Sequence, residues 1–372
     1  MRTTFSVEKI RGLIRRMAKI KIFCPACQRE LQCDGRQRGH RVKCPHCKTR
    51  VRVPQIFPLR PARRSWRNKK YFSLAAGIFL LTAGAVAWLL FFQPVRLRWT
   101  DRRPIGVLFL ASNYHSSATN PRGWFNEPGL DFTGAGGAER FRAALREYTD
   151  RSLAILKRTG AQGVIVWDLE GEQFPHKISF IGDPRTLDRL APEMAAAADE
   201  FFARLHDAGL RIGVTIRPQQ LTIDEFGLPH QNFSLDLKKT LLEKIDYARK
   251  RWGATLFYVD SNSGLWRPDE LWQLRRVAAA RPDVLLIPEH HGVPYAAFSA
   301  PYVSLRKDAA AATGKWARKF FSDSFQALDI SDCAADWAEI TAAQSNGDLL
   351  LFRAWVWSPE CDLLETFAGG KK

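Results

Sequence analysis

Four cysteines near the N-terminus have the spacing of a metal site. They form two Cys-x-x-Cys pairs separated by 16 residues, Cys24-Pro-Ala-Cys27 and Cys44-Pro-His-Cys47. Each pair makes a tight turn that aims two thiolates at one point, and four thiolates supply the tetrahedral sulfur shell typical of Zn²⁺. Because all four positions are filled by protein, the site is expected to be structural. The sequence predicts a zinc ribbon over residues 19–53 whose folding energy comes from the metal.

Other uses of the cysteines fit less well. A haem attachment site needs His directly after the pair, but Gln28 and Lys48 stand there, and no βαβ context suggests a thioredoxin-like motif. Cys33 has no partner and is expected to be structural. Cys333 and Cys361 lie far along the chain, where they either pair or remain buried free thiols.

The segment resembles the small zinc-ribbon modules that begin many bacterial membrane-anchored proteins. The resemblance leaves the ribbon's partner open, and a cytoplasmic protein is one candidate. Residues 1–16 read as a basic amphipathic arm, but Met17 opens Met-Ala-Lys-Ile-Lys-Ile-Phe-Cys, which has the character of a natural start. We expect translation to begin at Met17.

An apolar stretch over residues 71–92 predicts one transmembrane helix. Its 22 residues contain no charge, Asn, Gln or Pro. About 20 apolar residues span a bilayer as a helix, whereas a buried helix of a soluble domain keeps a polar stripe. A cleaved signal peptide would not begin some 70 residues into the chain.

The charge divides at this stretch. Residues 1–70 hold 21 Lys and Arg against 3 Asp and Glu, and residues 71–372 hold 35 of each. The basic linker 54–70 has six Lys and Arg, against four in residues 93–103. The positive-inside rule then predicts a single-pass protein of a bacterial inner membrane, with a cytoplasmic N-terminus and a periplasmic C-terminal domain. The basic segment is expected to contact the lipid bilayer, and nucleic acid is the less favoured partner.

Residues 104–370 repeat one unit, an amphipathic helix followed by a short apolar strand. Continuous apolar strands alternating with helices indicate buried parallel strands. Six such strands are clear, and residues 301–305 and 324–330 supply the sixth and seventh of eight, which predicts an α/β fold of the (β/α)8 or TIM-barrel class. A doubly wound open sheet is the alternative, but no Gly-x-Gly-x-x-Gly opens a helix, and no cofactor is expected in this domain.

In such a barrel the active site lies where the strands end. Carboxylates close at least three strands in succession, and burying them together is costly unless they serve a function. The candidates in strand order are His115 after the first strand, Asp168 and Glu170 after the second, Arg217 after the third, Asp260 and Asn262 after the fourth, Glu289, His290 and His291 after the fifth, Asp329 at the seventh, and Trp355 and Trp357 at the eighth.

The domain resembles the (β/α)8 barrels of glycoside hydrolases, and its order of carboxylates is similar to that of the α-amylase-like clan. The resemblance implies Asp260 as nucleophile, Glu289 as acid/base and Asp329 as transition-state stabiliser. The local motifs depart from that clan, which has Arg two residues before the nucleophile where this chain has Tyr258, and an Asn-His-Asp-like motif where it has Leu328-Asp329. Polysaccharide is the implied substrate, with His115, Arg217, Asn262, His290, Asp329 and Trp355 as binding residues.

Three alternatives stay open. Asp168-x-Glu170 is similar to the pairs of lysozyme-like and chitinase-like barrels, and it is a second candidate for catalysis; otherwise the two bind sugar hydroxyls or pair with Arg217. A catalytic metal on His115, Asp168, Glu170 and His290 or His291 is disfavoured because adjacent His side chains on a strand point apart. The third alternative is a barrel without activity that binds a glycan or a protein and signals across the membrane to the ribbon.

Overall fold

The computed structural model divides the chain into two compact units, Met1–Ile78 and Phe79–Lys372, which are described separately. The residues that it describes are 20–37, 39–53, 81–82, 84, 97, 99–112, 114–127, 129–172, 181–263, 267–304, 309–330 and 337–354. Most of the predicted transmembrane stretch 71–92 lies outside them, as do Cys333, Cys361, Trp355 and Trp357. Among the described residues, no helix has both the length and the apolar character needed to cross a membrane.

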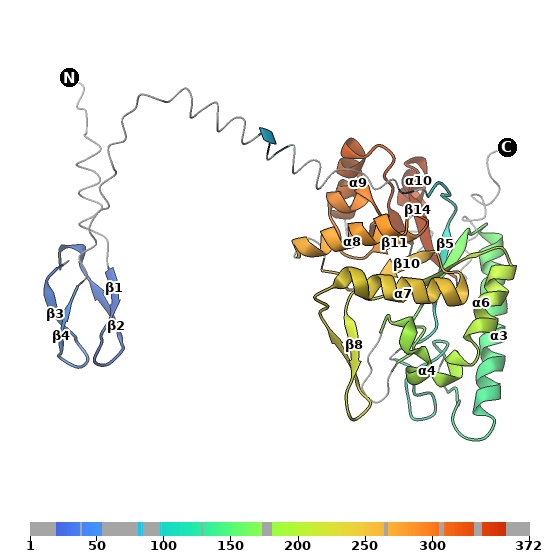
Figure 1. Ribbon diagram of the computed structural model, residues 1–372, viewed down its shortest axis with the longest axis horizontal. Helices are drawn as coiled ribbons and strands as arrows, with labels where there is room; N and C mark the ends of the chain where they lie inside the picture. The colour runs from blue at the N-terminus through green and yellow to red at the C-terminus, as the bar shows by residue number, and fades with distance from the viewer. Residues whose placement is uncertain are drawn as a thin grey trace. The chain divides into compact units, whose positions relative to one another are not determined.

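The first unit is a ribbon of two antiparallel hairpins, drawn in blue in Figure 1. One hairpin joins β1 (Ile20–Phe23) to β2 (Glu30–Cys33), and the other joins β3 (Arg41–Lys43) to β4 (Arg50–Arg52). A short 3-10 turn, η1 (Gly35–Gln37), precedes β3. Each Cys-x-x-Cys pair occupies a hairpin turn, and a small core joins the two hairpins through Cys24, Leu31, Cys33, Cys44, Val51 and Val53.

The second unit contains eight parallel strands in a nearly closed ring. In chain order the strands are β5 (Ile105–Phe109), β6 (Gly163–Trp167), β7 (Arg211–Ile216), β10 (Leu256–Val259), β11 (Leu285–Pro288), β12 (Tyr302–Ser304), β13 (Ala327–Ile330) and β14 (Leu349–Arg353). Each pairs with the next except β11 with β12, and the last strand pairs with the first. This is the strand order of a (β/α)8 barrel, as predicted. The strand ladder is interrupted between β11 and β12, and single hydrogen bonds cross that gap, from Ala300 N to Leu286 O (3.0 Å) and between His291 Nε2 and Tyr302 O (2.6 Å).

Helices follow the strands around the outside of the ring (Figure 1). They are α3 (Gly137–Arg158), α4 (Leu187–Leu190), α5 (Pro192–Ala195), α6 (Ala198–Asp207), α7 (Leu237–Trp252), α8 (Pro268–Ala280), α9 (Ala309–Phe320) and α10 (Trp337–Ser345), with short 3-10 turns η3 (Pro184–Thr186) and η5 (Val293–Ala297).

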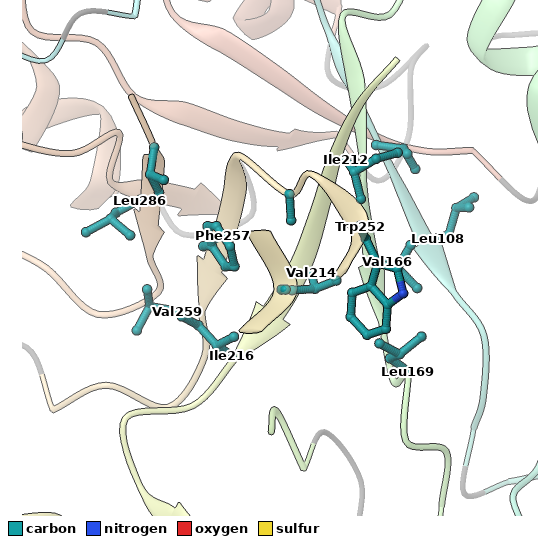
Figure 2. Packing of buried hydrophobic residues seen from close by; sticks show 14 of the residues in the cluster. Leu108, Val166, Leu169, Ile212, Val214, Ile216, Trp252, Phe257, Val259 and Leu286 are labelled. Carbon is teal, nitrogen blue, oxygen red and sulfur yellow. The ribbon is translucent and has the colours of Figure 1, made fainter. Parts of the chain in front are cut away.

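Alternate residues of each strand divide between two apolar layers. The outward side chains of β6, β7 and β10, such as Val166, Val214 and Phe257, pack under the helices, where Trp252 at the end of α7 lies beside them (Figure 2). The inward side chains form a separate cluster within the ring that includes Ile165, Leu256, Tyr258, Leu285, Ile287 and Leu351. Burial on both faces explains why the strands are continuous apolar runs in the sequence.

One element was not predicted, a hairpin of β8 (Gln220–Ile223) and β9 (Pro229–Asn232) inserted after β7. Its turn is organised by Asp224, whose carboxylate accepts hydrogen bonds from the backbone N–H groups of Phe226 (2.9 Å) and Leu228 (2.8 Å) and contacts His230 Nε2 (2.8 Å). The strands are mostly polar and exposed, so they lack the apolar run by which the barrel strands could be predicted.

Candidate active site at the barrel mouth

Three polar residues lie side by side where β7, β10 and β11 end. The register pairs Val259 with Ile216 on one side and with Pro288 on the other, and backbone hydrogen bonds extend the ladder by one residue, from Asp260 N to Ile216 O (2.9 Å) and from Glu289 N to Val259 O (3.1 Å). The next position of each strand is Arg217, Asp260 and Glu289. Period-two alternation above the inward Tyr258 and Ile287 turns Asp260 and Glu289 into the ring.

Asp260 is bound by its neighbour on β7. Arg217 Nε donates to Asp260 Oδ2, and the two side chains are only 14% and 13% exposed. Arg217 Nη1 also donates to Gln231 Oε1 of the β8–β9 hairpin (2.7 Å), and Ser261 Oγ donates to Asp260 (3.3 Å). The hairpin therefore holds Arg217, and Arg217 fixes the orientation of the Asp260 carboxylate.

Glu289 has the opposite environment. Burial is the largest cause raising its pKa, and the negative charge of the adjacent Asp260 carboxylate raises it further. A hydrogen bond from Ser261 N (2.8 Å) and the nearby His290 ring favour the charged form and act against this shift. The outcome is two neighbouring carboxyls in unequal environments, one bound by a cation and the other with a raised pKa.

Aromatic rings line the barrel beside this pair. Ring centroids are 4.4 Å apart for Phe109 and Trp167, 4.5 Å for Trp167 and Tyr258, and 5.4 Å for Tyr258 and Tyr302. Tyr302 Oη donates to Asp329 Oδ2 (2.9 Å), and burial raises the pKa of Tyr302, as the Asp329 carboxylate also does. Asp329 thus contributes to the same mouth from β13, through a tyrosine that the sequence analysis had not singled out.

The pair Asp168 and Glu170 lies in a different environment. Asp168 follows the inward Trp167, has φ of 56° and is buried, as is Glu170. Glu170 Oε1 accepts a hydrogen bond from Asp183 N (2.7 Å), and burial raises the pKa of Glu170 to about 7. The charged groups that act on Glu170 are Asp183 and the buried Lys244. Arg217 pairs instead with Asp260.

Lys244 of α7 was missed by the sequence analysis. It has 0% exposure, and its ammonium donates to three backbone oxygens, those of Gly182 (3.1 Å), Arg217 (2.8 Å) and Gln219 (2.8 Å), while lying 3.5 Å from Asp183 Oδ2. Burial lowers its pKa to about 8. Lys244 therefore fixes the backbone that carries Arg217. Its sequence surroundings gave no signal, because a Lys within an amphipathic helix is usually solvated.

The remaining candidates connect the loops around the mouth. Asn262 is buried and joins the loops after β10 and β11, donating to His290 O (2.6 Å) and accepting from His290 N (2.8 Å). The His290 ring is 60% exposed, with Nε2 at 3.8 Å from Glu289 Oε2. His115 is half-buried in the loop after β5. Asn262 thus orders the loops, and His290 remains accessible beside the carboxyl pair.

The four ribbon thiols form a compact group that could hold a metal ion. All four sulfurs lie within 4.8 Å of one another, with Cys24 Sγ 3.5 Å from Cys47 Sγ and Cys27 Sγ 3.7 Å from Cys44 Sγ, and none is in a disulfide. Sulfurs bound tetrahedrally to Zn²⁺ at about 2.3 Å would be about 3.8 Å apart. The donor set and its spacing therefore fit Zn²⁺.

The thiol pKa values also suit a bound cation. Hydrogen bonds from Thr49 lower the pKa of Cys47 to about 6. A backbone hydrogen bond from Arg29 lowers that of Cys27, but burial and the other three thiols together raise it to about 12. The Cys47 thiolate forms readily, whereas the neighbouring thiols oppose that of Cys27, and a bound cation would stabilise both as thiolates.

No protein family and no curated protein matches this sequence. Among solved structures, the chain is similar to a maltogenic α-amylase, AmyB, from Thermotoga neapolitana, with 12% identity, coverage of 72% of this chain and 76% of that one, and a TM-score of 0.44. It is also similar to an α-amylase from Geobacillus thermoleovorans (10% identity, coverage 73% and 79%, TM-score 0.44). A Rubisco-like protein from Rhodopseudomonas palustris matches to a comparable degree (11% identity, coverage 77% and 72%, TM-score 0.41). The strand order itself establishes the barrel.

Proposed function

We propose that the barrel is a glycoside hydrolase acting on an envelope or extracellular polysaccharide. The observation that carries the proposal is the unequal carboxyl pair, in which Arg217 binds Asp260 while burial and Asp260 raise the pKa of Glu289. Glycoside hydrolysis uses two carboxyl groups in unequal environments, one as the proton donor and the other as the nucleophile or base.

In this mechanism Glu289 donates its proton to the glycosidic oxygen while the Asp260 carboxylate attacks the anomeric carbon. The bond from that carbon to the leaving oxygen breaks as the bond to Asp260 forms. Glu289, now a carboxylate, accepts a proton from the water that displaces Asp260 and releases the sugar. In this proposal Arg217 orients the nucleophile and the exposed His290 contacts sugar.

The neighbouring positions of the two carboxyls favour a retaining reaction. Carboxyls of retaining enzymes stand about 5–5.5 Å apart and those of inverting enzymes farther. Asp260 and Glu289 follow the hydrogen-bonded ends of adjacent strands, and the Glu289 side chain is 30% exposed, so it is accessible to an entering sugar.

The proximity of the two carboxyls is also compatible with a second function, a barrel that binds a glycan or a protein partner without hydrolysis. Two carboxyls that stay too close together for a sugar carbon to stand between them would bind a ligand without cleaving it. The domain would then signal through a membrane helix to the ribbon.

The rest of the proposed organisation comes from the sequence. The basic N-terminus and ribbon occupy residues 1–53, a linker 54–70, a transmembrane helix 71–92 and the barrel 104–370. In a bacterial inner membrane this arrangement puts the barrel outside the cytoplasm, where polysaccharides are found. Cys24, Cys27, Cys44 and Cys47 would hold one structural Zn²⁺.

The test compares wild-type protein with Glu289→Gln and Asp260→Asn on isolated peptidoglycan, capsular polysaccharides and a set of dinitrophenyl glycosides. Both variants are expected to lose at least about 100-fold in reducing-end release from polysaccharide. Glu289→Gln should keep far more activity on dinitrophenyl glycosides, whose leaving group needs no acid. Asp283→Asn, at an exposed ion pair with Arg249, is the matched control. Wild-type rates in Glu289→Gln would refute the assignment, and ligand binding without turnover would favour the second function.

A further inference from the structure

The second ribbon hairpin presents four cations on one face. Strand alternation puts Arg41 and Lys43 on the same side of β3, and Arg50 and Arg52 on the same side of β4. The register pairs Arg41 with Arg52 and Lys43 with Arg50, and all four residues are exposed. The opposite side carries Val42 and Val51, which belong to the ribbon core. We call the exposed side, made by Arg41, Lys43, Arg50 and Arg52, the basic face.

The basic face is dense enough to act as one anion site. Cross-strand neighbours stand about 5 Å apart at Cβ, and residues two apart on a strand about 7 Å. Like charges directly opposite each other destabilise a hairpin. Within the described part of the chain, none of these four side chains forms an ion pair, whereas Lys21 on the other hairpin pairs with Glu30 (2.8 Å). The ribbon thus tolerates repulsion that an external polyanion would relieve.

The adjoining sequence favours an anionic membrane surface as the polyanion. Only residues 54–70 separate the ribbon from the apolar stretch 71–92, for which we propose a membrane helix, and six of them are Lys or Arg. A chain of 17 residues spans at most about 60 Å when fully extended, so a ribbon tethered to such a helix stays within that distance of the bilayer. The basic face also has no aromatic residue among its four positions on which a base could stack, as single-stranded nucleic acid binding uses.

We propose that the basic face binds the phosphate groups of anionic phospholipids, holding the ribbon against the membrane. The site is independent of the activity proposed for the barrel. Each Lys or Arg near an anionic lipid surface contributes about 1 kcal/mol, which is about fivefold in partitioning. Four cations on one face make the contact strong and specific to that face.

The test uses the full zinc-loaded chain in nanodiscs of neutral phosphatidylcholine. Cosedimentation is measured with sucrose-loaded vesicles of phosphatidylcholine alone or with 30% phosphatidylglycerol. The face variant is R41Q/K43Q/R50Q/R52Q, and the charge-matched control is K21Q/R29Q/R36Q/K48Q, which removes four cations elsewhere on the ribbon. Zinc stoichiometry verifies that each ribbon is folded. Should the face variant lose zinc, R41K/R50K/R52K, which keeps the charges, takes its place and is expected to bind like wild type.

Wild-type protein is expected to bind phosphatidylglycerol vesicles and not neutral ones, with loss of binding in 1 M salt. The face variant should bind at least tenfold more weakly and the control less than threefold more weakly. Equal losses in the two variants would show an effect of net charge alone and overturn the proposal, as would loss of binding in the charge-keeping variant. Single-stranded RNA that binds wild type more tightly than the vesicles, with the same dependence on the face, would overturn the lipid assignment in favour of nucleic acid.

Discussion

Replacing Glu170 by Gln is expected to remove a pH-dependent loss of barrel stability. Glu170 is 2% exposed, and burial, with a smaller contribution from the Asp183 carboxylate, raises its pKa to about 7. A glutamate in the unfolded chain has a pKa of about 4.3. Between these values the native state holds a proton that the unfolded chain has released. The free energy of unfolding must therefore fall as the pH rises through this window.

The size of the effect follows from the two pKa values. At about 1.4 kcal/mol for each pKa unit, the wild-type barrel loses about 3 kcal/mol between pH 4 and pH 7.5 through this residue. Lys244 acts in the opposite sense at higher pH. Its pKa is lowered to about 8, so the native state releases its proton first and stability rises from about pH 8 to 10. Gln keeps the acceptor oxygen for Asp183 N but has no proton to lose. The variant should therefore lack the fall in stability between pH 4 and 7.5 and keep the rise from about pH 8 to 10.

The assay is urea unfolding followed by tryptophan fluorescence from pH 4.5 to 9.5, which reports mainly on the barrel because ten of the 12 Trp lie between residues 99 and 357 and none lies in 19–53. Glu147→Gln, exposed on α3, is the matched control and should reproduce the wild-type profile. A Glu170→Gln variant that lost stability between pH 5 and 7 as steeply as wild type would refute the reasoning, because another group would then carry the proton.

Three further perturbations have defined outcomes. Cys27→Ser should lower bound zinc below one equivalent and unfold the ribbon without shifting the barrel's fluorescence-detected midpoint, as measured by metal analysis and urea titration; an unchanged zinc content would contradict the four-thiolate site. Lys244→Met should cost about 3–5 kcal/mol in urea unfolding, because it leaves three buried carbonyls without their donor and removes one of the two cations, Lys244 and Arg185, beside Asp183; a loss below 1 kcal/mol would show that the site relaxes or fills with water. Gly213→Ala should cost about 1–3 kcal/mol, since the new Cβ would lie 2.6 Å from Leu256 Cβ inside the ring; an unchanged midpoint would show that the ring can expand there.

The sequence was sufficient to predict the barrel because its strands are buried on both faces. The segment 163–167 is a continuous apolar run. The segments 301–305 and 324–330 are less apolar, and they could be predicted as strands only because they stand where the repeat of helix and strand requires one. The β8–β9 hairpin could not be predicted this way, because its pairing depends on the local hydrogen bonds of Asp224. The missing pairing between β11 and β12 could not be predicted either, because the distance between two strands of the ring is not encoded in the sequence of either strand.

The candidate site divides in the same manner. The adjacency of Asp260 and Glu289 followed from consecutive strands that end in carboxylates. Their unequal environments did not, because they depend on burial and on Arg217, 43 residues before Asp260. The grouping of Glu170, Asp183 and Lys244 could not be predicted for a similar reason. Lys244 reaches this group across 62 residues, where it donates a hydrogen bond to Gly182 O.

Trapping the covalent intermediate tests the central claim most directly. The full-length protein is incubated with a set of 2-deoxy-2-fluoroglycosyl fluorides, and the label is located by mass spectrometry of its peptides. Asp260 as nucleophile predicts one sugar per protein on the peptide containing Asp260, and no label in Asp260→Asn. A label on Glu289 or on Asp168, or polysaccharide hydrolysis with inversion at the anomeric carbon, would contradict the account.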